Sequence, residues 1–156
     1  MTAMAEGFAG LGLLLGTYTP KLDEKGRLIL PAKFRGRLSS GLVMTKGQER
    51  CLFLLPMDEF QQIYTQIRQA PVTSKAARDY TRNFLAGASD EVPDKQGRVS
   101  IPTHLREYAG LDREVVVIGV GTRVEVWDAQ AWATYQEQTE PDYIDQAEEI
   151  FPGLSF

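Results

Sequence analysis

A fourteen-residue segment occurs twice in this chain, and this repetition constrains the fold more than any other feature. The residues LDEKGRLILPAKFR at 22–35 align without a gap to PDKQGRVSIPTHLR at 93–106. The two copies share five identities at a constant separation of 71 residues: Asp, Gly, Arg, Pro and Arg. Leu52–Leu54 and Val124–Val126 extend the similarity after a one-residue shift. The sequence therefore predicts two halves of about 70 residues, each with the same order of structural elements.

Each copy has the pattern of a tight turn, a short strand and a short helix. Gly26 and Gly97 lie where the turn favours a positive φ. After each glycine, apolar residues alternate with outward-facing ones, which is the pattern of a strand with one buried face. Pro31 and Pro102 follow where a helix can begin, because proline at the first helical position loses no N–H that the helix needs. The short helices are expected at 32–38 and 103–109.

Hydrophobic periodicity predicts the remaining elements of each half. The further strands are expected at 17–22, 42–45, 51–55, 115–120 and 124–127. One closing helix is expected at 58–69, and a second after Asp128, which would cap it. An additional helix between the halves would begin at Thr73 or Ser74 and end at Gly87. The expected segments are an N-terminal extension that we expect to be flexible (1–14), a first repeat (15–70), a helical linker (71–87), a second repeat (88–138) and an acidic tail (139–156), either frayed or docked on a neighbour.

The formal net charge of −4 taken alone argues against nucleic acid as a partner, but this charge is unevenly distributed. From Glu137 to Phe156 there are six acidic residues and no Lys or Arg. Between Lys21 and Arg37 there are six basic residues and two acidic ones. A positively charged patch is therefore expected on the first repeat, despite the acidic total.

Several classes of protein are disfavoured by what the sequence contains. The single Cys51 and single His104 provide neither a disulfide framework nor a Cys/His zinc site, and we expect no cofactor. Cys51 lies in an apolar strand and is expected to be an inert core thiol. No converging set of nucleophile and base is recognisable, so an enzyme is not expected. The apolar run 8–15 is too short to cross a bilayer, so we expect a cytoplasmic protein with no membrane partner.

The repeated string Asp-x-x-Gly-Arg, then an alternating apolar triplet, then Pro-x-x-apolar-Arg resembles the SpoVT–AbrB class of swapped-hairpin DNA-binding domains. Two copies in one chain resemble the MraZ family of transcriptional regulators. The segments GTYTPKLDEKGRLILPAKFR and GASDEVPDKQGRVSIPTHLREYAGL carry this resemblance, which covers roughly residues 15–138. Residues 1–12 precede the usual start of the family.

The resemblance implies a fold, a function and partners. The fold would be α+β, a pseudo-twofold β-barrel made of two swapped-hairpin repeats with flanking helices. The function would be sequence-specific binding of double-stranded DNA at short, G-containing direct repeats in the promoter of the division and cell-wall gene cluster, including the protein's own promoter. The protein would form a ring-shaped, octamer-like homo-oligomer and would associate with the nucleoid.

The residue types of the motif suit contact with DNA. Arg27 could donate two parallel hydrogen bonds to guanine, and lysines near the turn could contact phosphates. A ring that presents several patches to repeated sites gains affinity through effective concentration. DNA contacts are predicted for Lys25, Arg27, Lys33, Arg35, Lys95, Arg98 and Arg106. Bracing of the two loops is predicted for Asp23, Gly26, Asp94 and Gly97.

Alternatives remain open at this point. Asp23 and Arg27 could form a surface ion pair that only stabilises a turn, and Arg98 with Lys95 could do the same. Arg35 and Arg106 could be solvated residues on helix faces. If only one copy contacts DNA, the first is favoured by its charge. The alternative function is an AbrB-type antitoxin or a protein-interaction module that acts through the acidic tail.

Overall fold

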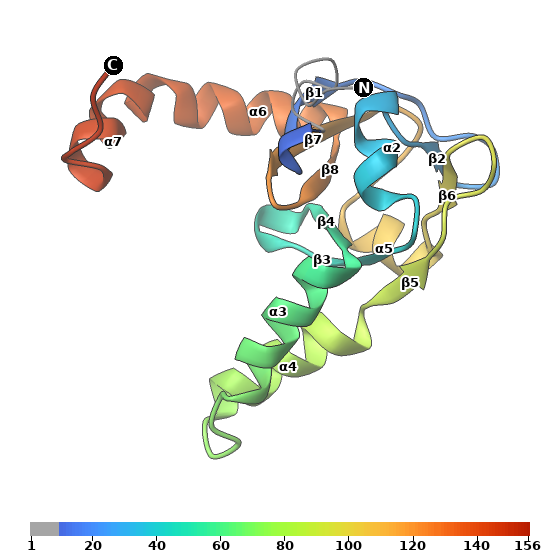
Figure 1. Cartoon of the computed structure of the whole chain (residues 1–156), viewed down its shortest axis with the longest axis horizontal. Coiled ribbons are helices and arrows are strands. Elements are labelled where there is room, and N and C mark those ends of the chain that lie inside the picture. The colour runs from blue at the N-terminus through green and yellow to red at the C-terminus, as the bar shows by residue number, and fades with distance from the viewer. Residues whose placement is uncertain (1–9) are drawn as a thin grey trace.

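The computed structural model describes residues 10–156, so residues 1–9 of the predicted extension lie outside the described residues. The fold is α+β, as predicted (Figure 1). The strands are β1 (Leu14–Tyr18), β2 (Arg27–Ile29), β3 (Leu42–Lys46), β4 (Leu52–Pro56), β5 (Ser89–Glu91), β6 (Arg98–Ser100), β7 (Val115–Gly121) and β8 (Val124–Asp128). The α-helices are α2 (Ala32–Leu38), α3 (Met57–Arg68), α4 (Lys75–Ala86), α5 (Thr103–Tyr108), α6 (Ala129–Thr139) and α7 (Tyr143–Ile150). Short 3-10 turns are η2 (Gln48–Arg50) and η3 (Glu140–Asp142).

The strands form a six-stranded antiparallel sheet in the order β1-β7-β8-β4-β3-β5 and a separate two-stranded antiparallel ribbon of β2 and β6. Each strand of the first half has a counterpart in the second: β1 with β5, β2 with β6, β3 with β7, and β4 with β8. Exchanging counterparts reverses the order of the large sheet and leaves it otherwise unchanged. The topology therefore has the twofold pseudosymmetry that the sequence repeat predicts.

The two halves are interleaved rather than placed side by side. β1 of the first half pairs with β7 of the second, and β5 of the second half pairs with β3 of the first. The ribbon takes one strand from each half. Each half therefore completes its hydrogen bonding with strands of the other half, and neither half forms its sheet alone.

The strand pairings among residues 10–156 do not close into a continuous β-barrel. β1 and β5 end the large sheet, while β2 and β6 pair only with each other. Between β1 and β2, Pro20 lacks a donor for a ladder. The links from this segment to the residues before β7 are a bridge between Lys21 and Glu114 and a 2.8 Å bond from the Leu22 amide to the Arg113 carbonyl. The first strand also lies earlier than predicted, at 14–18 instead of 17–22, because this proline interrupts it.

The inner face of the ribbon packs into the same core as the large sheet. Leu28, Leu30, Val99 and Ile101 are at most 2% exposed, and all four belong to one cluster with residues of β1, β3, β4, β7 and β8. The alternation in the sequence predicted which residues of each short strand face inward. Burial of this face fixes which residues the ribbon presents to solvent.

Helix boundaries follow the sequence signals closely. The first short helix spans 32–38, as predicted, and Ser74 caps α4 by accepting a hydrogen bond from the Ala77 amide. Asp128 caps α6 by accepting from the Ala131 amide at 3.0 Å. Two projections leave the body of the molecule in Figure 1: the α3–α4 hairpin and the long α6, which carries η3 and α7 at its far end.

Candidate nucleic-acid interface

Two turns of the same geometry lead into the strands of the ribbon. In the first, the Gly26 amide donates to the Asp23 carbonyl at 3.0 Å, and the Asp23 amide donates to the Arg27 carbonyl at 3.0 Å. The second turn repeats both bonds between residues 94, 97 and 98, at 2.9 and 3.0 Å. Gly26 and Gly97 adopt φ of 75° and 78°. The prediction of positive φ at both glycines is confirmed.

Each aspartate ties its turn to the arginine that follows. Asp23 Oδ1 accepts hydrogen bonds from the amides of Lys25 and Arg27, both at 2.9 Å, while Oδ2 accepts from Arg27 Nε at 2.6 Å. Asp94 makes the same three contacts, with the amides of Gln96 and Arg98 and with Arg98 Nε at 2.8 Å. The carboxylate thus fixes the backbone of the turn and the direction of the guanidinium together.

These contacts also keep the carboxylates charged. The backbone N–H of Arg27 lowers the pKa of Asp23 below its usual value, with further lowering by the Arg27 side chain and the Lys25 amide. The same set of donors, led by the backbone N–H of Arg98, lowers the pKa of Asp94. Both carboxylates are therefore ionised near neutral pH and hold their arginines by charge-assisted hydrogen bonds.

The second arginine of each copy crosses to the turn of the other copy. Arg35 Nε donates to the Leu30 carbonyl at 3.0 Å, and a Cβ at Gly97 would lie 2.5 Å from that same nitrogen. In the mirrored contact, Arg106 Nε donates to the Ile101 carbonyl at 3.0 Å, and a Cβ at Gly26 would lie 2.7 Å from its guanidinium carbon. Each turn therefore needs glycine twice, for its backbone angle and for the space that the crossing arginine fills.

This cross-bracing rules out one of the alternatives raised by the sequence. Arg35 and Arg106 are half-buried rather than solvated residues on helix faces, and Arg106 Nη2 also donates to Thr103 Oγ1 at 3.0 Å. Sequence reasoning missed the crossing contact. The signal that could have found it is the identical spacing of Gly and Arg in both copies, because such pairs satisfy each other across a twofold axis.

The outer face of the ribbon brings the two motif arginines close together. Arg27 pairs in register with Ser100, and Ile29 pairs with Arg98, so all four residues share one face. The side chain of each aspartate bonds only the Nε of its arginine. The Nη groups of both arginines therefore have no hydrogen-bond partner within residues 10–156. Ile29 is 49% exposed between them and was not among the predicted contact residues.

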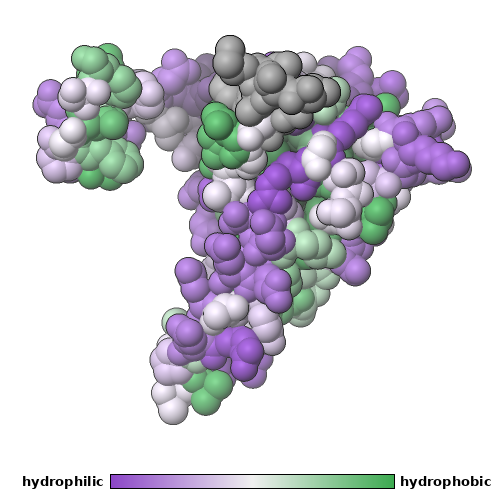
Figure 2. All heavy atoms as spheres, viewed as in Figure 1, coloured by the Kyte–Doolittle hydropathy of each residue, from purple (hydrophilic) through white to green (hydrophobic). Residues whose placement is uncertain are grey.

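The remaining predicted residues lie around this face without mirroring each other. Lys25 and Lys95 are exposed in the two turns, at neighbouring rather than equivalent positions. Lys33 is exposed on α2, whereas its counterpart His104 places Nε2 3.1 Å from the Gly87 carbonyl oxygen. Figure 2 shows hydrophilic surface at the end of the molecule where Figure 1 places β2, β6 and their turns.

The described part of the chain offers neither a reactive cysteine nor a metal-binding cluster. Cys51 is 1% exposed, and burial raises the pKa of its thiol, so the thiolate needed for nucleophilic chemistry is disfavoured. Residues 10–156 hold no cluster of three or more His, Cys, Asp or Glu side chains arranged to bind a metal ion. Within the same residues, no helix combines the length and apolar character needed to cross a membrane.

Comparison with known proteins finds likeness along both halves of the chain. A family model described as "MraZ protein, putative antitoxin-like" matches this chain twice, over residues 13–83 and 84–152. A protein of Leifsonia xyli subsp. xyli named "Transcriptional regulator MraZ" is 62% identical over 142 residues, which cover 91% of this chain and 99% of that protein. Proteins of the same name from Salinispora arenicola and Kineococcus radiotolerans are 61% and 59% identical, over 91% of this chain and 100% and 99% of their own lengths. On this likeness along both halves, the chain belongs to the MraZ family.

Proposed function

We propose that this protein is a sequence-specific DNA-binding transcriptional regulator that reads its site with the β2–β6 ribbon. The observation that carries this proposal is the pair Arg27 and Arg98. They lie on one outer face of a two-stranded ribbon, each held by a carboxylate through Nε alone. The relatives' shared name, "Transcriptional regulator MraZ", supports the same function.

The ribbon has the shape and chemistry for reading the major groove. That groove admits a two-stranded antiparallel ribbon, and guanine presents its O6 and N7 acceptors there. An arginine oriented through Nε keeps its Nη groups for two parallel bonds to those acceptors. Because the two arginines are related by the pseudosymmetry, one chain would read two nearby guanines. This agrees with the proposed target, short G-containing direct repeats.

Other residues of the predicted set would supply affinity and position. Lys25, Lys95 and Lys33 are exposed and suited to phosphates, which add binding strength without sequence choice. Arg35 and Arg106 would act mainly through the turns that they brace, with any phosphate contact made by their Nη groups. Asp23 and Asp94 would not touch DNA, because a carboxylate repels phosphate.

The proposed biological setting follows from the resemblance of the whole chain to the family. The DNA would be the promoter of the division and cell-wall gene cluster, including the protein's own gene, within the nucleoid of the cytoplasm. The interleaved repeats 15–70 and 88–138 would form the swapped-hairpin fold of the family, with the pairings around the ribbon left open, and several chains would form an octamer-like ring. One chain alone would engage few phosphates and bind weakly. In a ring, once one chain has bound a repeat, the other chains are held near the neighbouring repeats, which raises their effective concentration at those sites.

Binding to DNA from upstream of the protein's own gene tests this proposal. Fluorescence anisotropy should show binding that weakens as salt rises, with a log–log slope of about 0.9 per phosphate contact. The double variant Arg27→Ala/Arg98→Ala should lose preference for this DNA over a scrambled duplex, while circular dichroism stays unchanged. Equal affinity of wild type and double variant for the promoter would refute the proposal.

One alternative function retains an observation in its favour. The tail is acidic, and Tyr143 and Ile144 at the start of α7 are 73% and 79% exposed, which suits a protein-interaction module. A salt-independent response in the anisotropy experiment would favour that function over DNA binding.

A further inference from the structure

The end of the chain forms a projection with an acidic and apolar surface. We define the C-terminal arm as residues 140–156, which comprise η3, α7 and the segment after it. The arm contains five acidic residues and no Lys or Arg: Glu140, Asp142, Asp145, Glu148 and Glu149. Its apolar residues are largely in solvent; Ile144 is 79% exposed, Ile150 60% and Phe151 58%. Figure 2 shows this apolar surface at the tip of the projection.

Among residues 10–139, no helix or strand buries this surface; within the arm itself, Leu154 and Phe156 line a hollow beside α7. α7 packs against η3, which continues α6, and none of the residues in α7 is buried. Figure 1 shows the arm pointing away from the body and away from the α3–α4 hairpin. Clusters of exposed apolar residues on a soluble protein mark interaction sites, because their burial is favourable and is not achieved within the chain.

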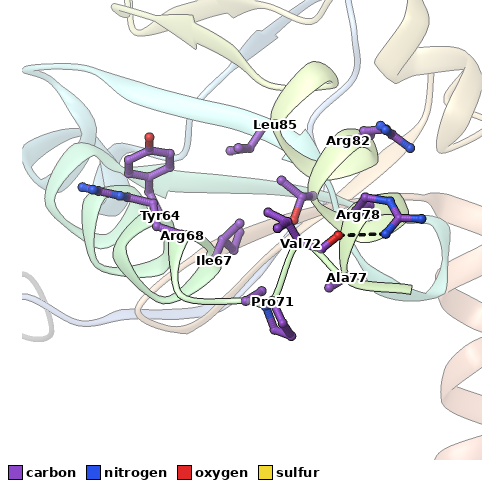
Figure 3. A pocket seen from close by; sticks show the side chains of 11 residues that line it. Tyr64, Ile67, Arg68, Pro71, Val72, Ala77, Arg78, Arg82 and Leu85 are labelled. Atoms are coloured by element: carbon purple, nitrogen blue, oxygen red, sulfur yellow. Dashed lines mark hydrogen bonds between the residues drawn. The ribbon is translucent and has the colours of Figure 1, made fainter. Parts of the chain in front are cut away.

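A second surface of the molecule has the complementary character. The α3–α4 groove is an open cavity of about 310 Å³ between the two helices and their connecting loop (Figure 3). Ile67, Pro71, Ala77 and Leu85 contribute an apolar lining. Its charged residues are Arg68, Arg78 and Arg82, and no acidic residue lines it. Arg78 is fixed beside the loop by a hydrogen bond from Nη1 to the Val72 carbonyl at 2.8 Å.

We propose that the C-terminal arm of one copy docks in the α3–α4 groove of a second copy. An apolar helix face with flanking acids would enter an apolar groove with a basic rim, which is the usual arrangement of helix-in-groove recognition. Asp145, Glu148 and Glu149 lie on α7 beside the exposed apolar residues, as the arginines lie beside the groove. Apolar burial would supply affinity, and the charges would fix orientation and choice of partner.

The charges also decide against pairing of two arms. Two arms face to face would bring five acids against five, with no basic residue between them. An arm in a groove is instead a head-to-tail contact, which gives a closed ring when the rotation closes. The inference therefore rests on the ring of the proposed function and names the surfaces that build it.

Full-length variants of two kinds, one with a defective arm and one with a defective groove, test the docking. The arm variant is Ile144→Asp/Phe151→Asp, at residues that are 79% and 58% exposed. The groove variant is Arg68→Glu/Arg82→Glu, with Val72→Glu as a second groove variant at a residue that is 80% exposed. The matched control is Arg50→Glu/Arg113→Glu, which reverses two exposed arginines outside the groove. Circular dichroism checks that each variant is folded.

Light scattering after size exclusion gives the outcome. Wild type and control should form the same large assembly, whereas the arm and groove variants should each have the mass of one chain. An equimolar mixture of these two variants should have the mass of two chains, because one intact arm and one intact groove remain and the contact cannot propagate. Wild-type assembly in either variant, or a mixture that stays monomeric, would overturn the inference, as would a wild type that is itself a monomer.

DNA binding separates this inference from the proposed function. The arm variant should keep its preference for a single promoter repeat over a scrambled duplex but lose the gain in affinity on DNA with several repeats. If the arm variant assembles as wild type does, while Arg27→Ala/Arg98→Ala still abolishes promoter preference, the docking is wrong and the proposed function stands. If assembly depends on arm and groove but wild type shows no promoter preference, the docking stands and the proposed function is wrong.

Discussion

The two turns of the ribbon share their bracing and differ in the side chains that they expose. The five identities between the copies all lie in bracing positions. The aspartates bind the turn amides, the glycines adopt positive φ, the first arginines bond the aspartates, the prolines precede α2 and α5, and the second arginines cross between the turns. The backbone geometry of the turns therefore accounts for the identities.

The differences between the turns lie where the side chain is exposed. Lys25 aligns with Gln96, Ile29 with Ser100, and Lys33 with His104, and all six residues are exposed. Two scaffolds of one geometry thus carry two chemical surfaces, with more positive charge on the first. Pseudosymmetry therefore fixes where the arginines lie, and under the proposed function the neighbouring side chains would decide how strongly each copy engages DNA.

Removing one motif arginine at a time is the most direct test of whether the two turns contribute equally to promoter binding. We expect Arg27→Ala to weaken promoter binding more than Arg98→Ala, because Lys25 and Lys33 make the electrostatic potential around Arg27 more positive. Loss of a bidentate contact to guanine should cost about 1–3 kcal/mol per site, or roughly 5- to 150-fold in affinity. Anisotropy at one fixed salt concentration measures both variants.

Arg27→Lys and Arg98→Lys are the matched controls for charge. Lysine keeps the positive charge but lacks the planar fork, so it should preserve affinity for scrambled DNA and lose preference for the promoter. Equal losses for both alanine variants would mean that the copies contribute equally. No loss for either would show that the ion pairs with Asp23 and Asp94 only stabilise the turns.

Glycine replacement tests whether the two turns are equivalent as scaffolds. Gly26→Ala and Gly97→Ala should each destabilise the fold by about 1–2 kcal/mol from the left-handed backbone alone. Displacement of Arg106 or Arg35 should add to this, since the new Cβ would lie within 2.7 or 2.5 Å of their guanidinium groups. Denaturant unfolding provides the measurement.

Gly36→Ala supplies the control for the glycine series. Gly36 lies inside α2, and a Cβ there meets nothing within 4 Å. Alanine should therefore stabilise this helix by roughly 0.5–1 kcal/mol. Neutral effects at Gly26 and Gly97 would contradict the cross-bracing, and a large effect at only one would show that the turns are unequal.

Much of this fold can be predicted from local sequence, for reasons visible in particular residues. The alternation in 27–30 and 98–101 shows which side chains are buried, because a strand has period two and one face is in the core. Ser74 and Asp128 mark helix starts because each side chain can accept from an unpaired amide of the first turn. The positive φ of Gly26 and Gly97 follows from turn chemistry.

Other features depend on contacts that a single copy of the motif does not show. The sequence aligns the halves but does not reveal that β1 pairs with β7 and β5 with β3, since strand exchange is a long-range choice. The crossing of Arg35 and Arg106 likewise exists only when the two turns face each other. The open pairing around the ribbon was missed because a barrel was inferred from the family resemblance, not from the pattern of any strand.

Exchanging the exposed charge between the two turns should have a smaller effect on DNA binding. Lys25→Gln makes the first turn resemble the second, and Gln96→Lys does the reverse. Each lysine that contacts a phosphate contributes about one contact to the salt dependence, so the log–log slope should fall or rise by about 0.9. Both changes should alter affinity for promoter and scrambled DNA alike. A selective effect on the promoter would place Lys25 on a base instead of a phosphate.

Acid titration compares the two carboxylates, and we expect the smallest effect there. The hydrogen bonds from the turn lower the pKa of Asp23 and Asp94 in the folded protein below the ordinary 3.8. A folded pKa below the unfolded one means that the stabilisation is complete above about pH 5 and is lost as pH falls through the folded pKa. Wild type should therefore be more stable than Asp23→Asn or Asp94→Asn at neutral pH, and this difference should vanish in acid. Thermal melts of the three proteins at a series of pH values measure it.

Because the same donors surround both carboxylates, the stabilities of the two asparagine variants should converge with that of wild type over the same pH range. Convergence at clearly different pH values would show that the two turns, alike in geometry, differ in electrostatic environment.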